Sequence, residues 1–495
     1  MRLFNRLSCS TKRIRPTIDT NDDFRKFGKK MVDLIADYNE NVPNMSVLPD
    51  VKSGYLVKLL PDEAPMEPES WESVCEDFEK AIVPGITPWN SPNFHAYYPT
   101  ANSYAAVMGG MLCDALGCVG FTWIASPACT ELERLTMDWL AKMFGLPEVF
   151  QHAGEGNGGG VIQGSTSEST LIAILAAKHR KMIEYDHDEV LASKLVAYTS
   201  RQSHSSVEKG VRLAGTKLRL VDTDERFRMR GDELRKAIEE DKAKGLIPFF
   251  VGASVGTTNV CAFDALDEIS AVSGEEKMWM HIDAAYAGAA MICPEFRYLV
   301  KGIENTDSLV VSCHKWLMVN FACAAMFVRD SLDLINLFDI NPLYLKHEYE
   351  NEISDFRHWQ IPLGRRFRSL KLWMVLKSYG VKGLQENIRC QIQQAKFFEE
   401  MVRKDARFEV INDVLMGLVC FRLIGDNALN EDLNKRVNEA RKIHMTPATV
   451  DGQFVLRFVV ASRLTEDKDI QFAWDEIKDH AGILLNNEEP KKRGV

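Results

Sequence analysis

The 495-residue sequence lacks several features that mark common classes of protein. Basic residues are not in excess: the net charge of −10 argues against nucleic-acid binding, which needs a basic surface. No apolar run reaches the length of a membrane span, and even residues 111–121 are interrupted by Asp114. The 11 cysteines, scattered from Cys9 to Cys420, show no paired spacing, which argues against a disulfide framework or a zinc site. We therefore expect a cytoplasmic globular protein with reduced thiols and without a nucleic-acid, membrane or metal partner.

Acidic side chains are also missing from residues 1–18, which hold Arg2, Arg6, Lys12, Arg13 and Arg15. This composition fits either a mitochondrial presequence or a disordered basic extension. We favour the extension, because no amphipathic apolar face accompanies the charges, and we assign residues 1–20 to it.

Two apolar runs in the second half of the chain end on ionisable side chains. The run Leu309-Val310-Val311-Ser312-Cys313-His314-Lys315-Trp316 predicts a buried strand that leads to Lys315, and His281-Ile282-Asp283-Ala284-Ala285 predicts one that ends on Asp283. Burial lowers the pKa of a lysine amine, as a Schiff-base lysine requires. An aspartate for a pyridinium nitrogen and a lysine for an aldehyde carbon are what a pyridoxal phosphate enzyme needs.

Strands and helices alternate from about residue 150, which predicts a mostly parallel sheet covered on both faces. Five strand ends carry polar groups. The first leads into Gly164-Ser165-Thr166-Ser167-Glu168, whose capping-box pattern places a phosphate-binding helix N-terminus there, and the others lead to His204, Thr258, Asp283 and Lys315. Each group alone has an ordinary structural explanation, but ligands bind at the carboxyl ends of such strands and one cofactor site explains all five.

The remaining segments predict the domain organisation. Residues 21–103, with a helix at 22–40 and many prolines, have little core and should wrap over a larger body or a second subunit. Residues 104–371 form the large cofactor-binding domain, with a polar mobile loop at 341–355. Residues 372–488 form a small α+β domain with strands at 408–424 and 454–461, and residues 489–495 are expected to be a disordered tail.

Residues 22–485 resemble the group II pyridoxal phosphate-dependent decarboxylases of the aromatic-L-amino-acid (dopa) decarboxylase type. The matching segments are Tyr97-Tyr98-Pro99-Thr100, Ser126-Pro127-Ala128-Cys129-Thr130-Glu131-Leu132-Glu133, Asp283-Ala284-Ala285-Tyr286-Ala287-Gly288 and residues 357–370. The resemblance implies an α/β protein of fold type I (aspartate aminotransferase-like): a large domain with a mostly parallel seven-stranded sheet, a small C-terminal α+β domain and an N-terminal helical dimerisation segment. It also implies a homodimer with shared active sites.

The reaction implied by this resemblance is the decarboxylation of aromatic L-amino acids to amines and carbon dioxide with pyridoxal 5'-phosphate. The substrates would be L-dopa and 5-hydroxytryptophan, with tyrosine, tryptophan or phenylalanine as further candidates, as in catecholamine and serotonin biosynthesis. Lys315 would bind the cofactor aldehyde, Asp283 would pair with the pyridine nitrogen, and His204 would stack over the ring. Tyr344, on the mobile loop, would supply the proton with help from His204.

Further contacts follow from the same resemblance. Ala285 would pack beneath the ring and Thr258 would meet its hydroxyl, while Thr166, Ser167, Ser312 and His314 would hold the phosphate. The substrate pocket would be lined by Trp89, Tyr97, Tyr98, Pro99, Thr100, His204 and Gly364, with Val119 and Phe121 from the other subunit.

The sequence departs from the family pattern at a few positions. Ser312 stands where the family usually has asparagine, Cys313 replaces a proline or small residue, and the loop at 346–355 is shorter than in the animal decarboxylase. Gly364 stands where related histidine decarboxylases carry serine, which favours a larger aromatic substrate. Two alternatives remain open. One is an oxygen-dependent aromatic acetaldehyde synthase, in which the loop tyrosine or stacking histidine is replaced, and the other is an inactive cofactor-binding protein.

Overall fold

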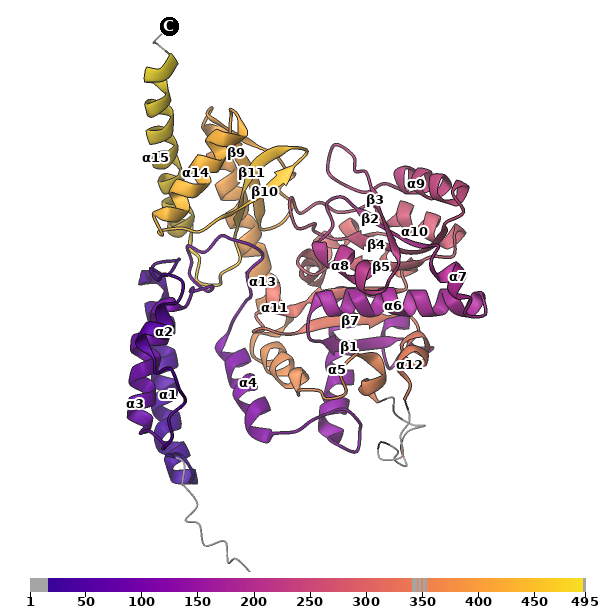
Figure 1. Ribbon diagram of the computed structural model, residues 1–495, viewed down its shortest axis with the longest axis horizontal. Coiled ribbons are helices and arrows are strands. Elements are labelled where there is room, and N and C mark those ends of the chain that lie inside the picture. The colour runs from indigo at the N-terminus through magenta and orange to yellow at the C-terminus, as the bar shows by residue number, and fades with distance from the viewer. Residues whose placement is uncertain (1–16, 341–344, 346–348, 350–352, 354, 493–495) are drawn as a thin grey trace, which may run out of the picture.

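The computed structural model describes residues 17–340, 345, 349, 353 and 355–492. Three parts follow one another along the chain (Figure 1). Helices α1 (Asn21–Asn41), α2 (Tyr55–Leu59) and α3 (Trp71–Asp77) lie together beside the main body. A large domain is built around a seven-stranded sheet, and a small domain is built around a four-stranded sheet.

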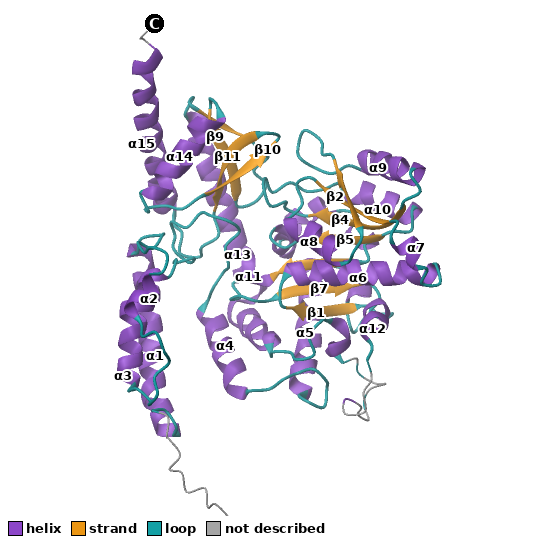
Figure 2. Ribbon diagram, viewed as in Figure 1, coloured by secondary structure: helices purple, strands orange, loops and turns teal. Residues whose placement is uncertain are grey.

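A seven-stranded sheet runs through the large domain (Figure 2) in the order β1-β7-β6-β5-β4-β2-β3. Its strands are β1 (Gly159–Gln163), β2 (Leu195–Ser200), β3 (Lys217–Val221), β4 (Ile247–Ser254), β5 (Trp279–Asp283), β6 (Ser308–Ser312) and β7 (Ala324–Val328). Only β7 runs antiparallel to its neighbours, and the other adjacent pairs are parallel. The predicted mostly parallel sheet is therefore confirmed.

Helices cover both faces of this sheet, so its strands, apart from the edge strand β3, are buried on both sides. Successive residues of β6 show the consequence: Leu309 and Val311 belong to one hydrophobic cluster, and Val310 between them belongs to the other. The helices of this domain include α4 (Tyr104–Leu116), α5 (Pro127–Phe144), α6 (Thr166–Glu184), α7 (Glu189–Ala192), α8 (Ser205–Leu213), α9 (Gly231–Ala243), α10 (Leu266–Glu275) and α12 (Leu332–Phe338). Helix α5 begins at Pro127 and ends before Gly145, which has a φ of 71°, as its sequence predicts.

The small domain contains a four-stranded antiparallel sheet with the order β10-β11-β9-β8. Its elements are β8 (Phe408–Val410), β9 (Leu418–Leu423), α14 (Asn427–Glu439), β10 (Thr446–Val450), β11 (Gln453–Val459) and α15 (Asp467–Lys492). The long helix α13 (Arg368–Lys404) joins it to the large domain and kinks at Gly380, whose backbone is not helical (φ 62°, ψ 173°).

The structure differs from the sequence-based expectation at three places in this domain. The single strand expected at 408–424 is two strands, β8 and β9. Strand β10 was not predicted, because it is a half-exposed edge strand that contains Pro447 and shows no apolar run. Helix α15 extends to Lys492 and so includes residues that we assigned to a disordered tail.

The N-terminal helices have little core of their own. Thr20 and Asp23 form a reciprocal capping box at the start of α1, which explains why this helix begins there. Phe27 is the only buried residue of α1, and Phe24 is 63% exposed. The predicted helix at 22–40 is thus confirmed, and its apolar surface is largely uncovered.

Within the part of the chain that the structure describes, no helix is both long and apolar enough to cross a membrane. The described residues also contain no group of three or more histidine, cysteine, aspartate or glutamate side chains arranged to hold a metal ion.

Candidate active site

A cavity of about 220 Å³ lies where β1, β2, β4, β5 and β6 end. Its lining residues are Tyr98, Ser165, Thr166, Ser167, His204, Ser254, Gly256, Thr257, Thr258, Asp283, Ala285, Tyr286, His314 and Lys315. The five strand ends that the sequence singles out therefore meet in one cavity. This is the expected outcome for a parallel sheet, whose strands present their carboxyl ends at the same edge.

Lys315 lies on the short helix α11 (Cys313–Trp316), directly after β6. Its Nζ is 5.8 Å from the centroid of the Tyr98 ring, and no carboxylate among the described residues forms an ion pair with it. Burial lowers the pKa of the Lys315 amine, although the nearby Asp283 carboxylate acts in the opposite direction. A buried amine with a lowered pKa is suited to attack an aldehyde carbon.

Asp283 is the last residue of β5, at the centre of the sheet between Ser254 of β4 and Val310 of β6. Its Oδ1 accepts a hydrogen bond from the backbone N–H of Ala285 at 3.0 Å, which fixes the carboxylate relative to Ala285. A carboxylate fixed at the base of the cavity can hold a proton on a ring nitrogen.

The N-terminus of α6 supplies hydroxyl and backbone N–H groups to the other end of the cavity. Ser165 is the N-cap and accepts from the N–H of Glu168 at 3.1 Å. The Glu168 carboxylate accepts from the N–H of Gly164 at 3.0 Å, so the predicted capping box closes one residue earlier than expected. Together with the helix dipole, the hydroxyl and backbone N–H groups of Thr166 and Ser167, in the first turn of α6, favour a phosphate group.

Ser312 is fully buried and does not line the cavity in the described structure. Its hydroxyl forms a hydrogen bond with the hydroxyl of Thr166, which does line the cavity. Ser312 therefore reaches the phosphate end through Thr166. Cys313, the neighbouring departure from the family pattern, lies in the hydrophobic core and has no exposed surface.

We predict that Ser312→Ala loses bound pyridoxal phosphate about fivefold faster than the wild type, because Thr166 loses the partner that orients its hydroxyl and one net hydrogen bond is worth about 1 kcal/mol. The measurement is cofactor absorbance during dialysis. Ser308→Ala is the matched control, since Ser308 is a buried serine at the other end of β6 whose hydroxyl contacts Trp279 and His281. Equal release rates for Ser312→Ala and the wild type would show that the hydroxyl pair does not support the phosphate.

Two histidines, His204 and His314, border the cavity. His204 is the N-cap of α8, and its Nδ1 accepts from the N–H of Ser206 at 3.1 Å. Burial lowers the pKa of His204, while Asp283 raises it and Lys315 lowers it. His314 Nδ1 accepts from the N–H of Cys323 at 3.0 Å, and burial lowers the pKa of His314 to about 4. Burial therefore favours the uncharged form of both rings, which can pack against an aromatic ligand.

The predicted substrate residues are only partly brought to this cavity. Tyr98 lines it, stacks on Tyr286 at 3.8 Å between ring centroids, and donates its hydroxyl to the Thr257 carbonyl at 3.0 Å. Trp89 and Tyr97 stack on each other outside the cavity, with 39% and 47% of their surfaces exposed. Pro99 and Thr100 follow Tyr98 in the chain and are not among the lining residues.

Val119 and Gly364 line a different cavity of about 240 Å³. A Cβ atom on Gly364 would lie 3.6 Å from Val119 Cγ1, which is an ordinary contact. The carbonyl of Phe121 accepts from the N–H of Arg357, which joins the segment that holds Val119 and Phe121 to the segment that precedes Gly364. Tyr344 lies outside the described residues. A single chain therefore keeps Val119, Phe121 and Gly364 apart from Lys315.

Several lining residues were absent from the predicted site: Ser165, Ser254, Gly256, Thr257 and Tyr286. Ser165 and Thr257 could have been found from their neighbours Thr166 and Thr258. Thr257 differs from Thr258 in role, because its hydroxyl accepts from the N–H of Ala262 and shapes the loop after β4. Tyr286 carries no local signal, since its place depends on the stack with Tyr98 and Trp316.

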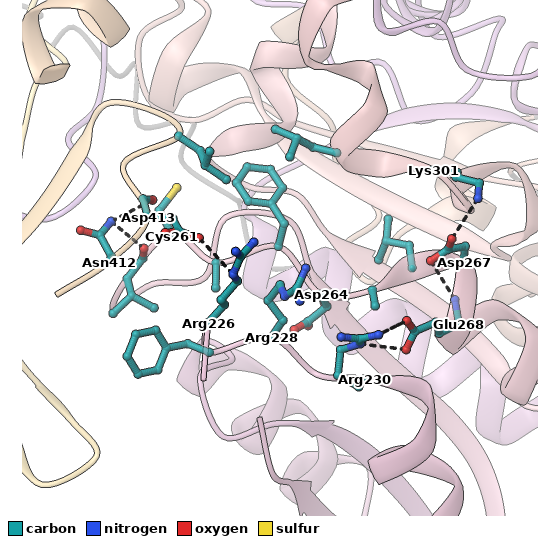
Figure 3. Close-up of a pocket in the computed structure, with 18 of the residues that line it drawn as sticks. Arg226, Arg228, Arg230, Cys261, Asp264, Asp267, Glu268, Lys301, Asn412 and Asp413 are labelled. Atoms are coloured by element: carbon teal, nitrogen blue, oxygen red, sulfur yellow. Dashed lines mark hydrogen bonds and ion pairs between the residues drawn. The ribbon is translucent and has the colours of Figure 1, made fainter. Parts of the chain in front are cut away.

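A larger cavity of about 520 Å³ lies beside the loop after β4 (Figure 3). Its cations face carboxylates: Arg230 binds Glu268, Lys301 lies 3.2 Å from Asp267, and Arg226 lies 3.7 Å from Asp413. Because these charges already have partners, we assign no ligand to this cavity.

Comparison with known proteins identifies the family. The conserved domain of pyridoxal-dependent decarboxylases matches residues 53–424. The chain belongs to this family. The aromatic-L-amino-acid decarboxylase of Mus musculus is 53% identical over 474 residues, covering 94% of this chain and 99% of the mouse protein. Pyridoxal 5'-phosphate is thus the cofactor of this decarboxylase. The 220 Å³ cavity has the groups that this cofactor requires: an amine, a carboxylate and a helix N-terminus that can bind phosphate.

Solved structures agree on the fold. Oryza sativa TDC, crystallised with PLP and tryptamine, is 40% identical, with a TM-score of 0.92 and coverage of 94% of this chain and 99% of that chain. Rhodiola rosea 4-hydroxyphenylacetaldehyde synthase is 37% identical, with a TM-score of 0.88 and the same coverage. The predicted fold type I architecture is therefore confirmed. Because a decarboxylase and an aldehyde synthase share it, the fold does not separate these two reactions.

Proposed function

We propose that this decarboxylase converts aromatic L-amino acids, among them L-dopa and 5-hydroxytryptophan, to the corresponding amines and carbon dioxide. The observation that carries the proposal is the meeting of Lys315, Asp283 and His204 with a hydroxyl-lined helix N-terminus in one cavity. The sequence similarity to aromatic-L-amino-acid decarboxylases over nearly the whole chain supports the substrate class.

In this proposal each residue has one task around the cofactor. Lys315 holds the aldehyde carbon, Asp283 holds a proton on the pyridine nitrogen, and Thr166 and Ser167 donate to the phosphate. Ala285 packs beneath the ring, Thr258 meets the ring hydroxyl, and His314 borders the phosphate end. When bound, pyridoxal phosphate supplies an electron-accepting ring that stabilises the electron pair left at Cα as carbon dioxide departs.

The last step is delivery of a proton to Cα. In the proposal His204 stacks over the cofactor and relays a proton, and the hydrogen bond from the Ser206 N–H, which holds its ring at the start of α8, supports this role. We assign the donor role to Tyr344, as the resemblance implies. An acid near Cα at that moment directs the reaction to amine and away from oxygen.

We further propose that the active enzyme is a homodimer. Val119 is 48% exposed, and it shares a cavity with Gly364 away from Lys315. An apolar groove of about 540 Å³, lined in part by Met31, Leu34 and Phe78, lies on the N-terminal helices. Burial of these surfaces by a second copy would bring Val119, Phe121 and Gly364 of one chain to the substrate ring bound by the other.

A cytoplasmic location is also part of this proposal. The described cysteines are all free thiols, as expected for a protein kept in a reducing compartment. The alternative of a mitochondrial presequence concerns residues 1–18, most of which lie outside the described residues.

The test is a competition assay with dopa, 5-hydroxytryptophan, tyrosine, tryptophan, phenylalanine and histidine, with products separated by chromatography and oxygen followed by an electrode. The proposal expects amine without oxygen uptake. Aldehyde and peroxide with oxygen uptake would establish the aldehyde synthase alternative, and no product from a cofactor-loaded protein would establish the inactive binding protein. Sedimentation of the active protein reports whether it is a dimer.

We predict that Gly364→Ser shifts the ratio of kcat/KM values about tenfold from dopa toward histidine, because one added group narrows a pocket for a large ring. The serine should be tolerated, since its Cβ would make only an ordinary contact with Val119. Gly383→Ser is the matched control, with a similar Cβ contact of 3.7 Å to Tyr379 far from the site. If both variants keep the wild-type ratio, Gly364 does not face the substrate.

A further inference from the structure

Arg457, on β11 of the small domain, contacts two walls of the active-site cavity without lining it. It is only 4% exposed. Nε donates to the Asn259 carbonyl at 3.1 Å, and Nη1 donates to Thr446 Oγ1 at 3.1 Å. Its Nη2 has no hydrogen-bond partner among the described residues, and a buried cation that is incompletely paired is costly to keep. The free-energy cost of burying the Arg457 charge is a reason to ask what its bonds to Asn259 and Thr446 hold in place.

The first bond holds the loop that follows β4. Asn259 comes directly after Thr258, which lines the cavity. The Asn259 carbonyl also accepts from the thiol of Cys420 at 3.2 Å. The next carbonyl, that of Val260, accepts from Nδ2 of Asn412, which Figure 3 labels, at 3.0 Å. The small domain thus binds this loop at two consecutive carbonyls, immediately beyond the residue placed near the cofactor.

The second bond, from Arg457 to Thr446, holds the segment Tyr97–Tyr98, which we call the aromatic wall of the cavity. Thr446 Oγ1, which accepts from Arg457, also accepts from the backbone N–H of Tyr97 at 3.1 Å. Tyr97 has a φ of 62°, an unfavourable conformation for a residue other than glycine, so its backbone needs support. The next residue, Tyr98, lines the cavity, and its ring centroid is 5.2 Å from the Arg457 guanidinium carbon.

We propose that Arg457 is a positioning residue that holds the Thr258 loop and the Tyr97–Tyr98 wall at a fixed separation. Thr258 of the loop and Tyr98 of the wall both line the cavity, so the separation of the two segments decides how the substrate lies against the cofactor. Small displacements of reacting groups have large effects on rate, which makes such a support valuable. The inference rests on the proposed function, because it requires a substrate ring beside Tyr98.

Two variants separate the two bonds. Arg457→Lys keeps the charge but loses the planar fork that reaches both Asn259 and Thr446. Thr446→Val keeps the shape of the side chain and removes the hydroxyl that accepts from both Arg457 and Tyr97, while the bond from Arg457 to Asn259 remains. Arg422→Gln is the control, since Arg422 is an equally buried arginine on β9 that donates to the Gly425 carbonyl within the small domain. Each purified protein is assayed for KM, kcat, the rate of cofactor release without substrate, and the melting temperature.

We expect Arg457→Lys to raise both the KM for the aromatic acid and the rate of cofactor release by about tenfold, the size of one lost charge-assisted hydrogen bond. Thr446→Val should raise KM and leave cofactor release unchanged, and Arg422→Gln should change neither, even if its melting temperature falls. A wild-type KM in Thr446→Val alongside a raised KM in Arg457→Lys would overturn the proposal, since it would indicate direct contact between Arg457 and substrate. Lower melting temperatures with unchanged KM and release would also overturn it. A wild-type protein that forms no amine would refute the proposed function, whereas the release rates would still test Arg457.

Discussion

Lys315→Ala should abolish covalent trapping of pyridoxal phosphate by borohydride and reduce amine formation by at least about a thousandfold. The physical reason is that the Lys315 amine is buried beside Asp283 and free of an ion pair among the described residues, which suits it to bond the aldehyde. The measurement is mass spectrometry of peptides from the reduced protein, together with a single-turnover amine assay.

Lys371→Ala is the matched control for this experiment. Lys371 is also buried, with 8% of its surface exposed, and burial likewise lowers the pKa of its amine. Its Nζ donates to the Asn320 carbonyl at 2.9 Å, outside the 220 Å³ cavity. Trapping should remain at Lys315 in Lys371→Ala. Detection of the cofactor on another lysine of Lys315→Ala would disprove the assignment of the cofactor aldehyde to Lys315.

The residues that the sequence located well are those whose position follows from local pattern alone. Asp283 ends one apolar run and Lys315 closely follows another. Each run predicts a buried strand, and a parallel sheet then brings both residues to one edge. Ser165 and Glu168 mark a helix start by their spacing. For these positions, local periodicity and the geometry of the sheet are sufficient information.

Other features could not be predicted because they depend on contacts between distant segments. Arg457 matters through Asn259, almost 200 residues earlier in the chain, and nothing around Arg457 in the sequence announces that contact. The separation of Val119 and Gly364 from Lys315 depends on how whole segments pack, and a second chain is needed to join them in the proposed dimer. The resemblance to the family implies roles for Val119 and Gly364, but the contacts that fix their positions can be seen only in the folded structure.

The second large effect is expected at Asp283. Replacement by asparagine keeps an oxygen that can accept from the N–H of Ala285 but removes the negative charge that holds a proton on the pyridine nitrogen. We expect Asp283→Asn to bind the cofactor and to lose about a hundredfold or more in kcat, because the ring without that proton is a weaker electron acceptor. Asp283→Glu, which restores the charge, should recover part of the loss.

A pH measurement tests the same charge without relying on turnover. Asp283 raises the pKa of the Lys315 amine, so its neutralisation should lower that pKa further and increase the neutral fraction of the amine at any given pH. The rate at which apo-protein captures pyridoxal phosphate should therefore reach its half-maximum at a lower pH in Asp283→Asn than in the wild type. Asp283→Glu should leave this midpoint close to that of the wild type. A midpoint that stays in place or rises in Asp283→Asn, with kcat unchanged, would mean that the Asp283 carboxylate acts on neither the lysine nor the pyridine nitrogen.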